Sequence, residues 1–428
     1  MSDKVDVLEA LKHSNVFLTG GAGVGKSYIT NEVITHYRKV GKQVVSLGST
    51  GVSAVNIGGF TVHSFFIFGI ANNFEELSHS DKRNKKRLSD LKKVLKATDL
   101  IIIDEISMVS SDLLDMIAYR LKHYGYLGKV MFVGDFFQLP PVQKQQRTDV
   151  FGERLYAFES NAWEGFDLMV IELTVMKRTT DAEFTHILSK VRKGICDEEV
   201  VSYMVRLWNN EIEEENPTYL FGRNMEVEQT NRAKINELPS EETILFANVE
   251  MHGNIHEKKL ASWKSMLPIS EHLTLKEGAP VLFTVNKWGK FVNGERGILR
   301  KIEEDHLIVE KEEEYVRVER HEFDLLDMLV KDDGAVETMS LATLSQFPLK
   351  LAYAVTIHKS QGMSIDKLVC NVDNIFAPSQ FYVAISRAVN PRHLKIDFNR
   401  GDLTQYLHRV LHVDQRVVDY YENLPVYS

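Results

Sequence analysis

The sequence is short of cysteine, of long apolar runs and of positive charge, and each shortage limits the classes of protein it can belong to. Its two cysteines, Cys196 and Cys370, lie far apart without companions at metal-ligand spacing, which argues against a disulfide framework and a zinc site. No apolar run approaches the roughly 20 residues of a membrane-spanning helix, and Met1 to Ala10 lacks the features of a signal peptide. We therefore expect a cytoplasmic, intracellular protein with no membrane partner.

Acidic residues outnumber basic ones by 60 to 51, so the net charge is −9. A protein that binds nucleic acid mainly by charge usually has an excess of lysine and arginine. A cleft that holds a short single strand needs only local positive charge, with backbone donors and stacking surfaces, so this class is not excluded. Because the 428-residue chain is longer than one hydrophobic core usually spans, and 44% of it is hydrophobic, we expect at least two domains.

Short β-branched apolar runs alternate along the chain with polar turns and amphipathic stretches, as they do in parallel α/β domains. In the first half the expected strands are Val16–Thr19, Val44–Leu47, Leu100–Asp104, Val130–Val133 and Met169–Leu173. In the second half they are Tyr219–Phe221, Leu351–Val355, Leu368–Val372 and Leu394–Ile396. The sequence therefore predicts two α/β domains, residues 1–175 and 176–428.

Two segments interrupt this pattern. From about Glu271 to Leu344, short strands with turn signals such as Asn293-Gly294 predict a small β-barrel inserted in the second domain. The segment from Ala71 to Lys96 is a short insertion in the first domain and is rich in positive charge. Its basic residues are Lys82, Arg83, Lys85, Lys86, Arg87, Lys92, Lys93 and Lys96. A solvated helix and a nucleic-acid contact both remain open for it.

A glycine-rich segment after the first expected strand fits the phosphate loop G-x-x-x-x-G-K-S/T, with a helix expected to follow. The candidate nucleotide-binding residues are Gly20, Gly21, Ala22, Gly23, Val24, Gly25, Lys26 and Ser27. Such glycines let backbone N–H groups turn toward phosphates, while the lysine reaches the β and γ phosphates and the hydroxyl ligates Mg²⁺. We therefore predict an ATP site with Lys26 as a catalytic residue.

Two later strands end in polar residues that suit the same site. Leu100–Asp104 is followed by Glu105, so two carboxylates lie at the edge of the sheet where ligands of α/β proteins bind. We expect Asp104 to hold Mg²⁺ through water and Glu105 to polarise the attacking water, because hydrolysis of ATP depends on positioning and charge neutralisation. Gln138, after the next strand, could sense the γ-phosphate.

The order of these blocks resembles superfamily-one helicases, and most closely the PIF (petite integration frequency) family, to which RecD and the phage Dda helicase are related. The matching segments are GGAGVGKS from Gly20, STGVSAVNIGGFTVHSFF from Ser49, IIIDEISMVSSDLLD from Ile101, VGDFFQLPPV from Val133, LTVMKRT from Leu173, VNGERG from Val292, TIHKSQGMSID from Thr356 and FYVAISRA from Phe381. They cover nearly the whole chain in the right order.

The resemblance implies two RecA-like motor domains that clamp ATP, with single-stranded DNA crossing both. Arg178 and Arg387 then match arginines that reach the γ-phosphate, and Gln361 and Gly362 complete the nucleotide cleft. The residues that match DNA-binding motifs are Thr50, Gly51, His63, Phe65, Thr356, His358, Lys359 and Ser360. Hydroxyls and lysine suit phosphates, whereas Phe65 and His63 could stack on bases or serve only in the core.

The resemblance further implies an ATP- and Mg²⁺-dependent 5′-to-3′ DNA helicase that acts on single strands and their junctions with duplex. The family is associated with DNA repair, recombination, telomere maintenance and G-quadruplexes. The chain departs from the family pattern in having no glutamine before Gln43 to read adenine, and in having Thr179 where a glutamine usually follows the arginine. A protein-displacing translocase, a nucleotide-dependent binding module and an RNA track remain open alternatives.

Overall fold

The computed structural model describes residues 2–69, 71, 73–141, 154–212, 216–287, 289–311, 314–330, 336–375 and 377–424. Asn72, in the predicted first insertion, and Val142, at the end of the VGDFFQLPPV segment, lie outside the described residues. Within that part of the chain, no helix has both the length and the apolar character needed to cross a membrane.

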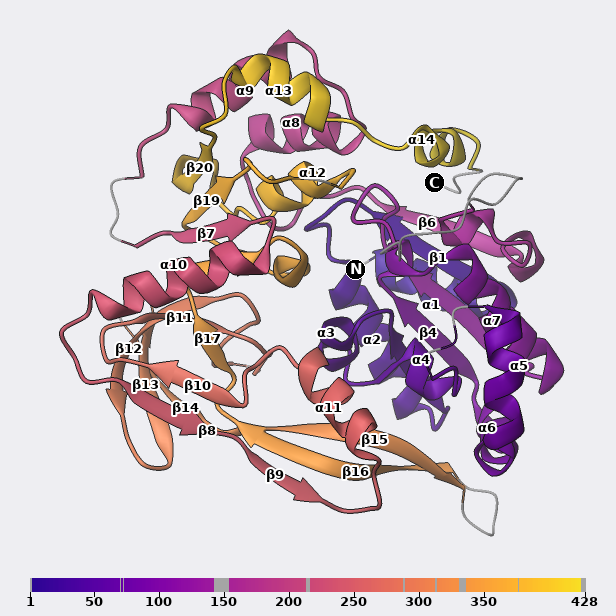
Figure 1. Cartoon of the computed structure of the whole chain (residues 1–428). Helices are drawn as coiled ribbons and strands as arrows, with labels where there is room; N and C mark the ends of the chain where they lie inside the picture. Colours follow the sequence, from indigo (N-terminus) through magenta and orange to yellow (C-terminus); the bar gives the residue numbers. More distant parts are fainter. Residues whose placement is uncertain are drawn as a thin grey trace.

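A six-stranded parallel sheet, in the order β3-β2-β4-β5-β1-β6, forms the centre of the N-terminal half (Figure 1). The strands are β1 (Asn15–Gly20), β2 (Val44–Gly48), β3 (Phe60–Thr61), β4 (Leu100–Asp104), β5 (Lys129–Val133) and β6 (Leu168–Leu173). The five predicted strands are confirmed, and the sheet adds β3. Continuous apolar runs form these inner strands because helices bury both faces of the sheet.

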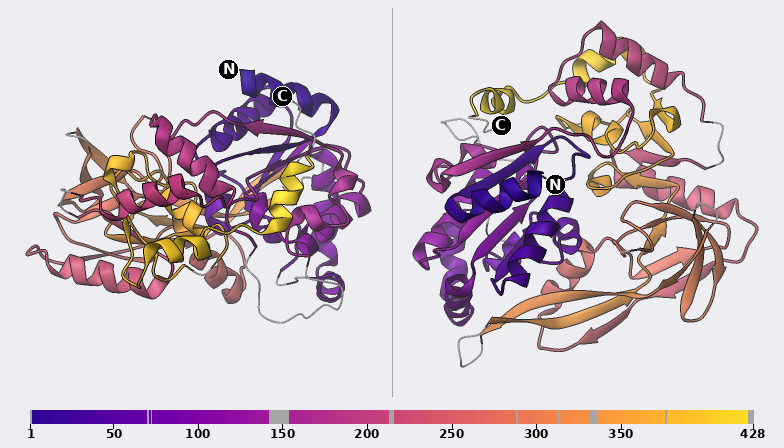
Figure 2. Two further views of the ribbon diagram at one scale, coloured as in Figure 1. Left: turned by 90° about the horizontal axis from the view of Figure 1, so that it is seen from above. Right: turned by 180° about the vertical axis from the view of Figure 1, so that it is seen from behind.

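Alternate side chains of the strands divide between two hydrophobic cores. Val16 and Leu18 face the core beneath α1 (Ser2–His13) and α2 (Lys26–Lys39), whereas Phe17 faces the core on the other side. The second core is covered by α4 (Val62–Phe65), α5 (Phe74–Arg83), α6 (Lys85–Ala97) and α7 (Ser111–His123), and α3 (Gly51–Asn56) follows β2. Figure 2 shows the layers from two further directions.

The predicted insertion at 71–96 forms the helices α5 and α6. Their apolar side chains, including Leu77 and Leu91, pack into the second core, whereas most of the basic side chains face outward. Asp81 receives a two-pronged hydrogen bond from the buried Arg120 of α7, with Nη1 2.7 Å and Nη2 2.5 Å from its two oxygens. This charge-assisted pair fixes the insertion to the first sheet.

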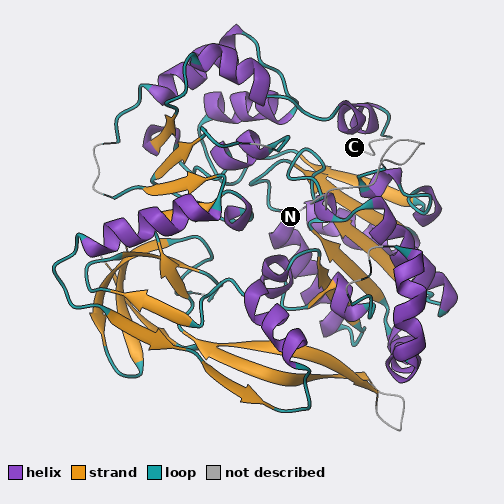
Figure 3. Cartoon of the chain, viewed as in Figure 1, coloured by secondary structure: helices purple, strands orange, loops and turns teal. Residues whose placement is uncertain are grey.

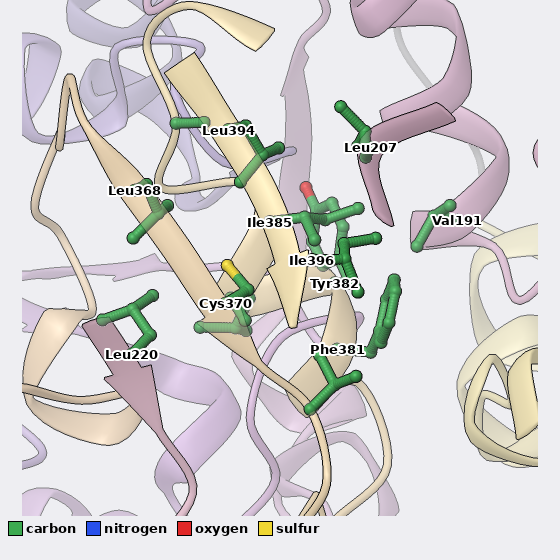
Figure 4. Close-up of a cluster of buried hydrophobic side chains, with 14 of the residues drawn as sticks. Val191, Leu207, Leu220, Leu368, Cys370, Phe381, Tyr382, Ile385, Leu394 and Ile396 are labelled. Carbon is green, nitrogen blue, oxygen red and sulfur yellow. The ribbon is translucent and has the colours of Figure 1, made fainter. Parts of the chain in front are cut away.

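A four-stranded parallel sheet, in the order β18-β7-β19-β20, forms the centre of the C-terminal half. Its strands are β7 (Thr218–Phe221), β18 (Ala354–Thr356), β19 (Leu368–Asn371) and β20 (Leu394–Asp397). The surrounding helices are α8 (Ala182–Arg192), α9 (Glu198–Trp208), α10 (Asn224–Asn236), α12 (Gln380–Ile385) and α13 (Leu403–Val410). Figure 4 shows strand residues such as Leu220 and Ile396 in one hydrophobic core with Phe381 of α12 and Leu207 of α9.

The predicted closed β-barrel is not confirmed. A five-stranded antiparallel sheet, β14-β13-β12-β11-β17, lies beside a three-stranded sheet, β15-β16-β9, and a two-stranded sheet, β10-β8. The strands are β8 (Thr243–Phe246), β9 (Asn248–Met251), β10 (His272–Leu275), β11 (Pro280–Phe283), β12 (Arg296–Ile302), β13 (His306–Lys311), β14 (Glu314–Glu319), β15 (His321–Val330), β16 (Val336–Gln346) and β17 (Leu349–Leu351). The strands do not close into a barrel because β15 pairs with β16, and β16 pairs with β9, so these three strands form a sheet of their own.

The long β15–β16 hairpin runs beneath the molecule toward α6, beside α11 (Glu257–Met266) (Figures 1 and 3). Asp327 of β15 lies 3.8 Å from an Nη of Arg87 in α6 and 3.9 Å from Nζ of Lys259 in α11. The last helix, α14 (Gln415–Glu422), returns to the first sheet, where Tyr421 stacks on Phe137 at 4.7 Å. Distant segments of the chain therefore meet around the N-terminal sheet.

Candidate functional site

The glycine-rich loop connects β1 to α2 and brings Lys26 to the first turn of that helix. Gly23 and Gly25 have φ values of 81° and 98°, which favour glycine. A Cβ on Gly23 would lie 2.7 Å from Cβ of Arg178, so a larger residue would displace that arginine. Lys26 Nζ donates to the carbonyl oxygens of Gly20 at 2.7 Å and Gly21 at 2.9 Å. The loop and its lysine thus form one compact unit.

Asp104 and Glu105 lie at the end of β4, as the sequence predicts. Glu105 has a φ of 56°, a left-handed conformation that is uncommon for a residue with a side chain and is often found at functional sites. Its Oε2 accepts a hydrogen bond from Nε2 of Gln361 at 2.9 Å, across the gap between the two parallel sheets. Burial raises the pKa of both carboxyls, and the charge of Glu105 raises that of Asp104 further.

Opposite charges surround Lys26. Burial lowers the pKa of Lys26, while the nearby carboxylates of Asp135 and Glu105 act in the opposite direction. Ser27, Asp104 and Glu105 line a cavity of about 280 Å³, which Gln361 and Gly362 also line from the second half. A hydroxyl that faces carboxylates across a cavity, together with the lysine that precedes it at the start of the helix, can hold phosphates and a divalent cation.

The donor set at this cavity fits Mg²⁺. The Ser27 hydroxyl and the Asp104 carboxylate both offer the hard oxygen ligands that Mg²⁺ prefers. Among the described residues, no group of three or more His, Cys, Asp and Glu side chains could by itself enclose a metal ion. Mg²⁺ usually keeps several waters and is bound through one or two carboxylates together with substrate phosphates.

Two arginines meet on the opposite side of the cleft. Arg178 donates to Oγ of Ser364 at 2.9 Å and to the carbonyl of Ser386 at 2.6 Å. Arg387 donates to the carbonyl of Val383 and to Oγ of Ser386, both at 2.9 Å. In the described part of the chain, neither guanidinium forms an ion pair. The carboxylate of Glu105 is near enough to Arg387 to raise its pKa, but two close arginines that form no ion pair still make a local positive site that suits an anion.

The pKa values of these arginines reflect the same environment. Burial lowers the pKa of Arg178 to about 9, and the like charge of Arg387 adds to this effect. Burial also lowers the pKa of Arg387. An anion placed between them would reverse both effects, because an opposite charge favours the charged form.

Gln138 is buried, and its Nε2 lies 3.4 Å from Oδ2 of Asp135. Asp135 is fully buried and forms an ion pair with Arg192 of α8, whose Nη2 lies 2.9 Å from Oδ1 of Asp135. Arg192 also lies over the rings of Phe137 and Tyr421. Sequence reasoning missed Arg192, because nothing in an ordinary amphipathic helix singles it out, although a buried aspartate after a core strand does require a partner.

Tyr382 is a second residue that the sequence did not single out. Its hydroxyl oxygen accepts a hydrogen bond from the backbone N–H of Ala22 at 2.9 Å, so α12 touches the phosphate loop directly. A Cβ on Gly21 would lie 3.3 Å from the same hydroxyl. The FYVAISRA segment was the available signal, but the sequence cannot tell which of its residues faces the loop.

The candidate DNA residues fall into a group that lines cavities, in which Lys359 is exposed and Thr356 is buried, and an interior group. Thr50, Gly51, Thr356 and Lys359 line one cavity of about 500 Å³, which brings together motifs from both halves. His63 and Gly51 line a further cavity of about 410 Å³. His358 is half-buried, and burial lowers its pKa.

Phe65 and Ser360 belong to the interior group. The Phe65 ring lies in the hydrophobic core 4.9 Å from Phe66, and Oγ of Ser360 donates to the carbonyl of Ile357 at 2.8 Å. Stacking a base on Phe65 would therefore require its ring to leave the core.

These features define a P-loop ATPase of mixed α/β fold, with its candidate nucleotide-binding residues between two parallel sheets. The family model for PIF1-like helicases matches residues 2–202, and a further helicase family model, of the herpes type, matches residues 299–417. The chain is 42% identical, over 99% of its length and 97% of the relative's, to the ATP-dependent DNA helicase Pif1 of Campylobacter jejuni. The chain belongs to the PIF1-like helicase family.

Solved structures agree with this assignment. Pif1 from Bacteroides sp in complex with ADP-AlF4 has a TM-score of 0.83 at 27% identity, covering 99% of this chain and 96% of that one. The same coverage and identity hold for Bacteroides Pif1 bound to single-stranded DNA, with a TM-score of 0.65. Both scores support the shared fold, and the arrangement of this chain is closer to that of the ADP-AlF4 complex.

Proposed function

We propose that this protein is an ATP- and Mg²⁺-dependent DNA helicase that moves 5′ to 3′ along single-stranded DNA and separates duplexes at their junctions with single strands. Residues 1–175 and 176–428 act as its two motor domains, and it acts inside the cell. One observation carries the proposal. Thr50 and Lys359 line both the cavity beside Ser27 and Asp104 and the larger cavity that joins the two DNA motifs. The candidate nucleotide cavity and the candidate strand-binding cavity thus share lining residues.

In the ATP-binding step, the loop from Gly20 to Ser27 holds the phosphates and Lys26 reaches the β and γ oxygens. Ser27 and Asp104 would hold Mg²⁺, which would supply neutralisation of the phosphate charge when bound. Glu105 then orients and polarises the attacking water. Its strained backbone and the hydrogen bond from Gln361 fix its direction.

Three further groups respond to the γ-phosphate. Arg178 and Arg387 offset the negative charge that develops on it, an effect worth on the order of 10³- to 10⁵-fold in rate for such arginines. Gln138 reports the presence of the γ-phosphate through Asp135. Because Gln361 contacts Glu105 and Gly362 lines the same cavity, closure of the cleft also moves the segment that carries Lys359.

Single-stranded DNA is the track. The similarity to a Pif1 structure bound to single-stranded DNA supports this assignment. Thr50, Gly51, Thr356 and Lys359 contact phosphates, while His63 and His358 lie along the same path. Two further candidates, Phe65 and Ser360, lie in the interior and stabilise the segments that carry the DNA-contacting residues.

The direction of movement rests on resemblance to the PIF and RecD group, since both directions of superfamily-one helicases use the same ATP chemistry. The short α5–α6 insertion serves as a wedge at the duplex junction. The β15–β16 hairpin contacts this insertion through Asp327 and Arg87, and it supports the single-stranded DNA.

Removal of Mg²⁺ is expected to abolish hydrolysis, and single-stranded DNA is expected to stimulate it. Without Mg²⁺ the phosphate charges have no counterion between them, and without DNA the Gln361 segment has no ligand to position it. Phosphate release should rise on the order of tenfold with a short oligothymidylate. It should fall to background with EDTA and recover when Mg²⁺ is added in excess. Equal turnover with and without DNA, or with and without Mg²⁺, would contradict the proposal.

A further inference from the structure

Lys350 is a half-buried lysine without an acidic partner. It lies in the short edge strand β17, opposite Leu282 of β11, between the hydrophobic residues Leu349 and Leu351. Among the described residues it forms no ion pair, and its one hydrogen-bond-like contact is from Nζ to Sδ of Met363 at 3.9 Å. A thioether is only a weak acceptor. The ammonium group is therefore poorly compensated within the protein.

Lys350 lines the cavity of about 500 Å³ that also contains Thr50, Gly51, Thr356 and Lys359. The charged and titratable residues among the lining are Lys350 and Lys359, with Glu228 from α10 and His272 from β10. His358 lies next to Lys359 in the chain. Two lysines thus face a cavity to which the described part of the chain contributes a single carboxylate.

A half-buried cation of this kind costs free energy unless an anion meets it. Burial lowers the pKa of Lys350 to about 7, and repulsion from Lys359 contributes. A phosphate between the two lysines would offset both effects, because an opposite charge favours the ammonium form. The geometry of the cavity and the shortage of acidic partners point to the same kind of ligand.

We propose that Lys350, together with Lys359, binds a phosphodiester group of the single strand. The inference rests on the proposed function, since it adds a phosphate contact to the proposed track. It also makes strand binding depend on a proton. Below about pH 7 the amine is already charged, whereas above it binding must draw a proton onto Lys350, so affinity falls as pH rises, by at most about tenfold per pH unit.

The test measures binding of a short fluorescent oligothymidylate by anisotropy, without nucleotide, over a range of salt at about pH 6.5 and about pH 8.5. The wild-type protein should bind more weakly at the higher pH. Lys350→Met should weaken binding at the lower pH by roughly fivefold to tenfold, reduce the log–log salt slope by about 0.7, and remove most of the pH dependence. Lys350→Arg should keep the affinity and lose the pH dependence, because a guanidinium stays charged.

Controls separate this inference from its alternatives. His272→Gln should retain the pH dependence, since it leaves Lys350 in place. Lys350→Met should unfold at the same or a higher temperature than the wild type, because it removes a poorly paired buried cation. If Lys350→Met does not fold, Lys350→Arg still decides the matter, since a pH dependence like that of the wild type would overturn the proposal.

Two outcomes point to different failures. If the wild-type protein does not bind oligothymidylate at all, the proposed function fails. If the wild type binds, and Lys359→Gln lowers the salt slope while Lys350→Met leaves the slope and the affinity unchanged, the track stands and the role of Lys350 is refuted.

Discussion

Lys26→Ala is expected to reduce DNA-stimulated ATP hydrolysis by at least about 10²- to 10³-fold, because the phosphates lose the cation that a preorganised site holds against them. The fold should remain, since Lys26 is hydrogen-bonded to Gly20 and Gly21 and contributes no apolar core volume. Phosphate release measures the first effect and thermal unfolding monitored by circular dichroism the second.

Lys39→Ala is the matched control, because Lys39 is an exposed lysine at the far end of the same helix. It should hydrolyse ATP at the wild-type rate. Near-normal turnover by Lys26→Ala would place the nucleotide elsewhere. A large fall in its unfolding temperature would show that Lys26 stabilises the loop rather than the phosphates.

Glu105→Gln is expected to bind ATP and DNA but to hydrolyse ATP about 10²- to 10⁴-fold more slowly, the range typical of general acid–base groups. The amide keeps the shape of the side chain and an oxygen that can accept from Gln361, and it loses only the negative charge that polarises water. Binding of a fluorescent ATP analogue and of oligothymidylate should therefore stay within a few-fold of the wild type, while phosphate release falls.

If Glu105→Gln hydrolyses ATP normally, Glu105 serves only to hold Gln361 across the cleft. In that case Gln361→Ala, which removes the hydrogen bond, should impair hydrolysis although Glu105→Gln does not. If Glu105→Gln loses nucleotide binding as well as hydrolysis, the residue acts in binding, and the assignment as the group that polarises water is wrong.

The N-terminal sheet could be predicted from the sequence because its central strands are continuous apolar runs, which only a strand buried on both faces requires. The two-residue strand β3 is too short to give such a pattern. The predicted strand Leu351–Val355 was wrong as a unit. Leu351 ends β17, whereas Ala354 and Val355 belong to β18 in a different sheet, and no local pattern marks that change.

The β-rich region shows a similar limit. Alternating residues and turn signals predicted strands correctly, but closure of a barrel depends on which strands pair over long distances. Pairing of β16 with β9, more than 80 residues earlier in the chain, could not be read from the strands themselves. The three sheets therefore remain separate although one hydrophobic core contains side chains from all of them.

The residues of the candidate site also divide into those that the sequence could predict and those that it could not. Lys26, Ser27 and Glu105 were predicted because each belongs to a contiguous motif with its own local geometry. The contact of Tyr382 with Ala22 and the ion pair of Arg192 with Asp135 join segments far apart in the chain. Only the packed structure brings them together, and the same is true of Lys350 beside the predicted DNA residues.

Strand separation on duplexes that carry a 5′ single-stranded tail, a 3′ tail or no tail tests the central claim most directly. Labelled duplexes are incubated with the protein and Mg²⁺, with ATP added or withheld, and the released strand is measured. The predicted result is unwinding of the 5′-tailed duplex that requires ATP, with little release from the other two. Efficient unwinding from 3′ tails alone would contradict the direction, and failure to unwind any duplex while ATP is hydrolysed would contradict the helicase itself.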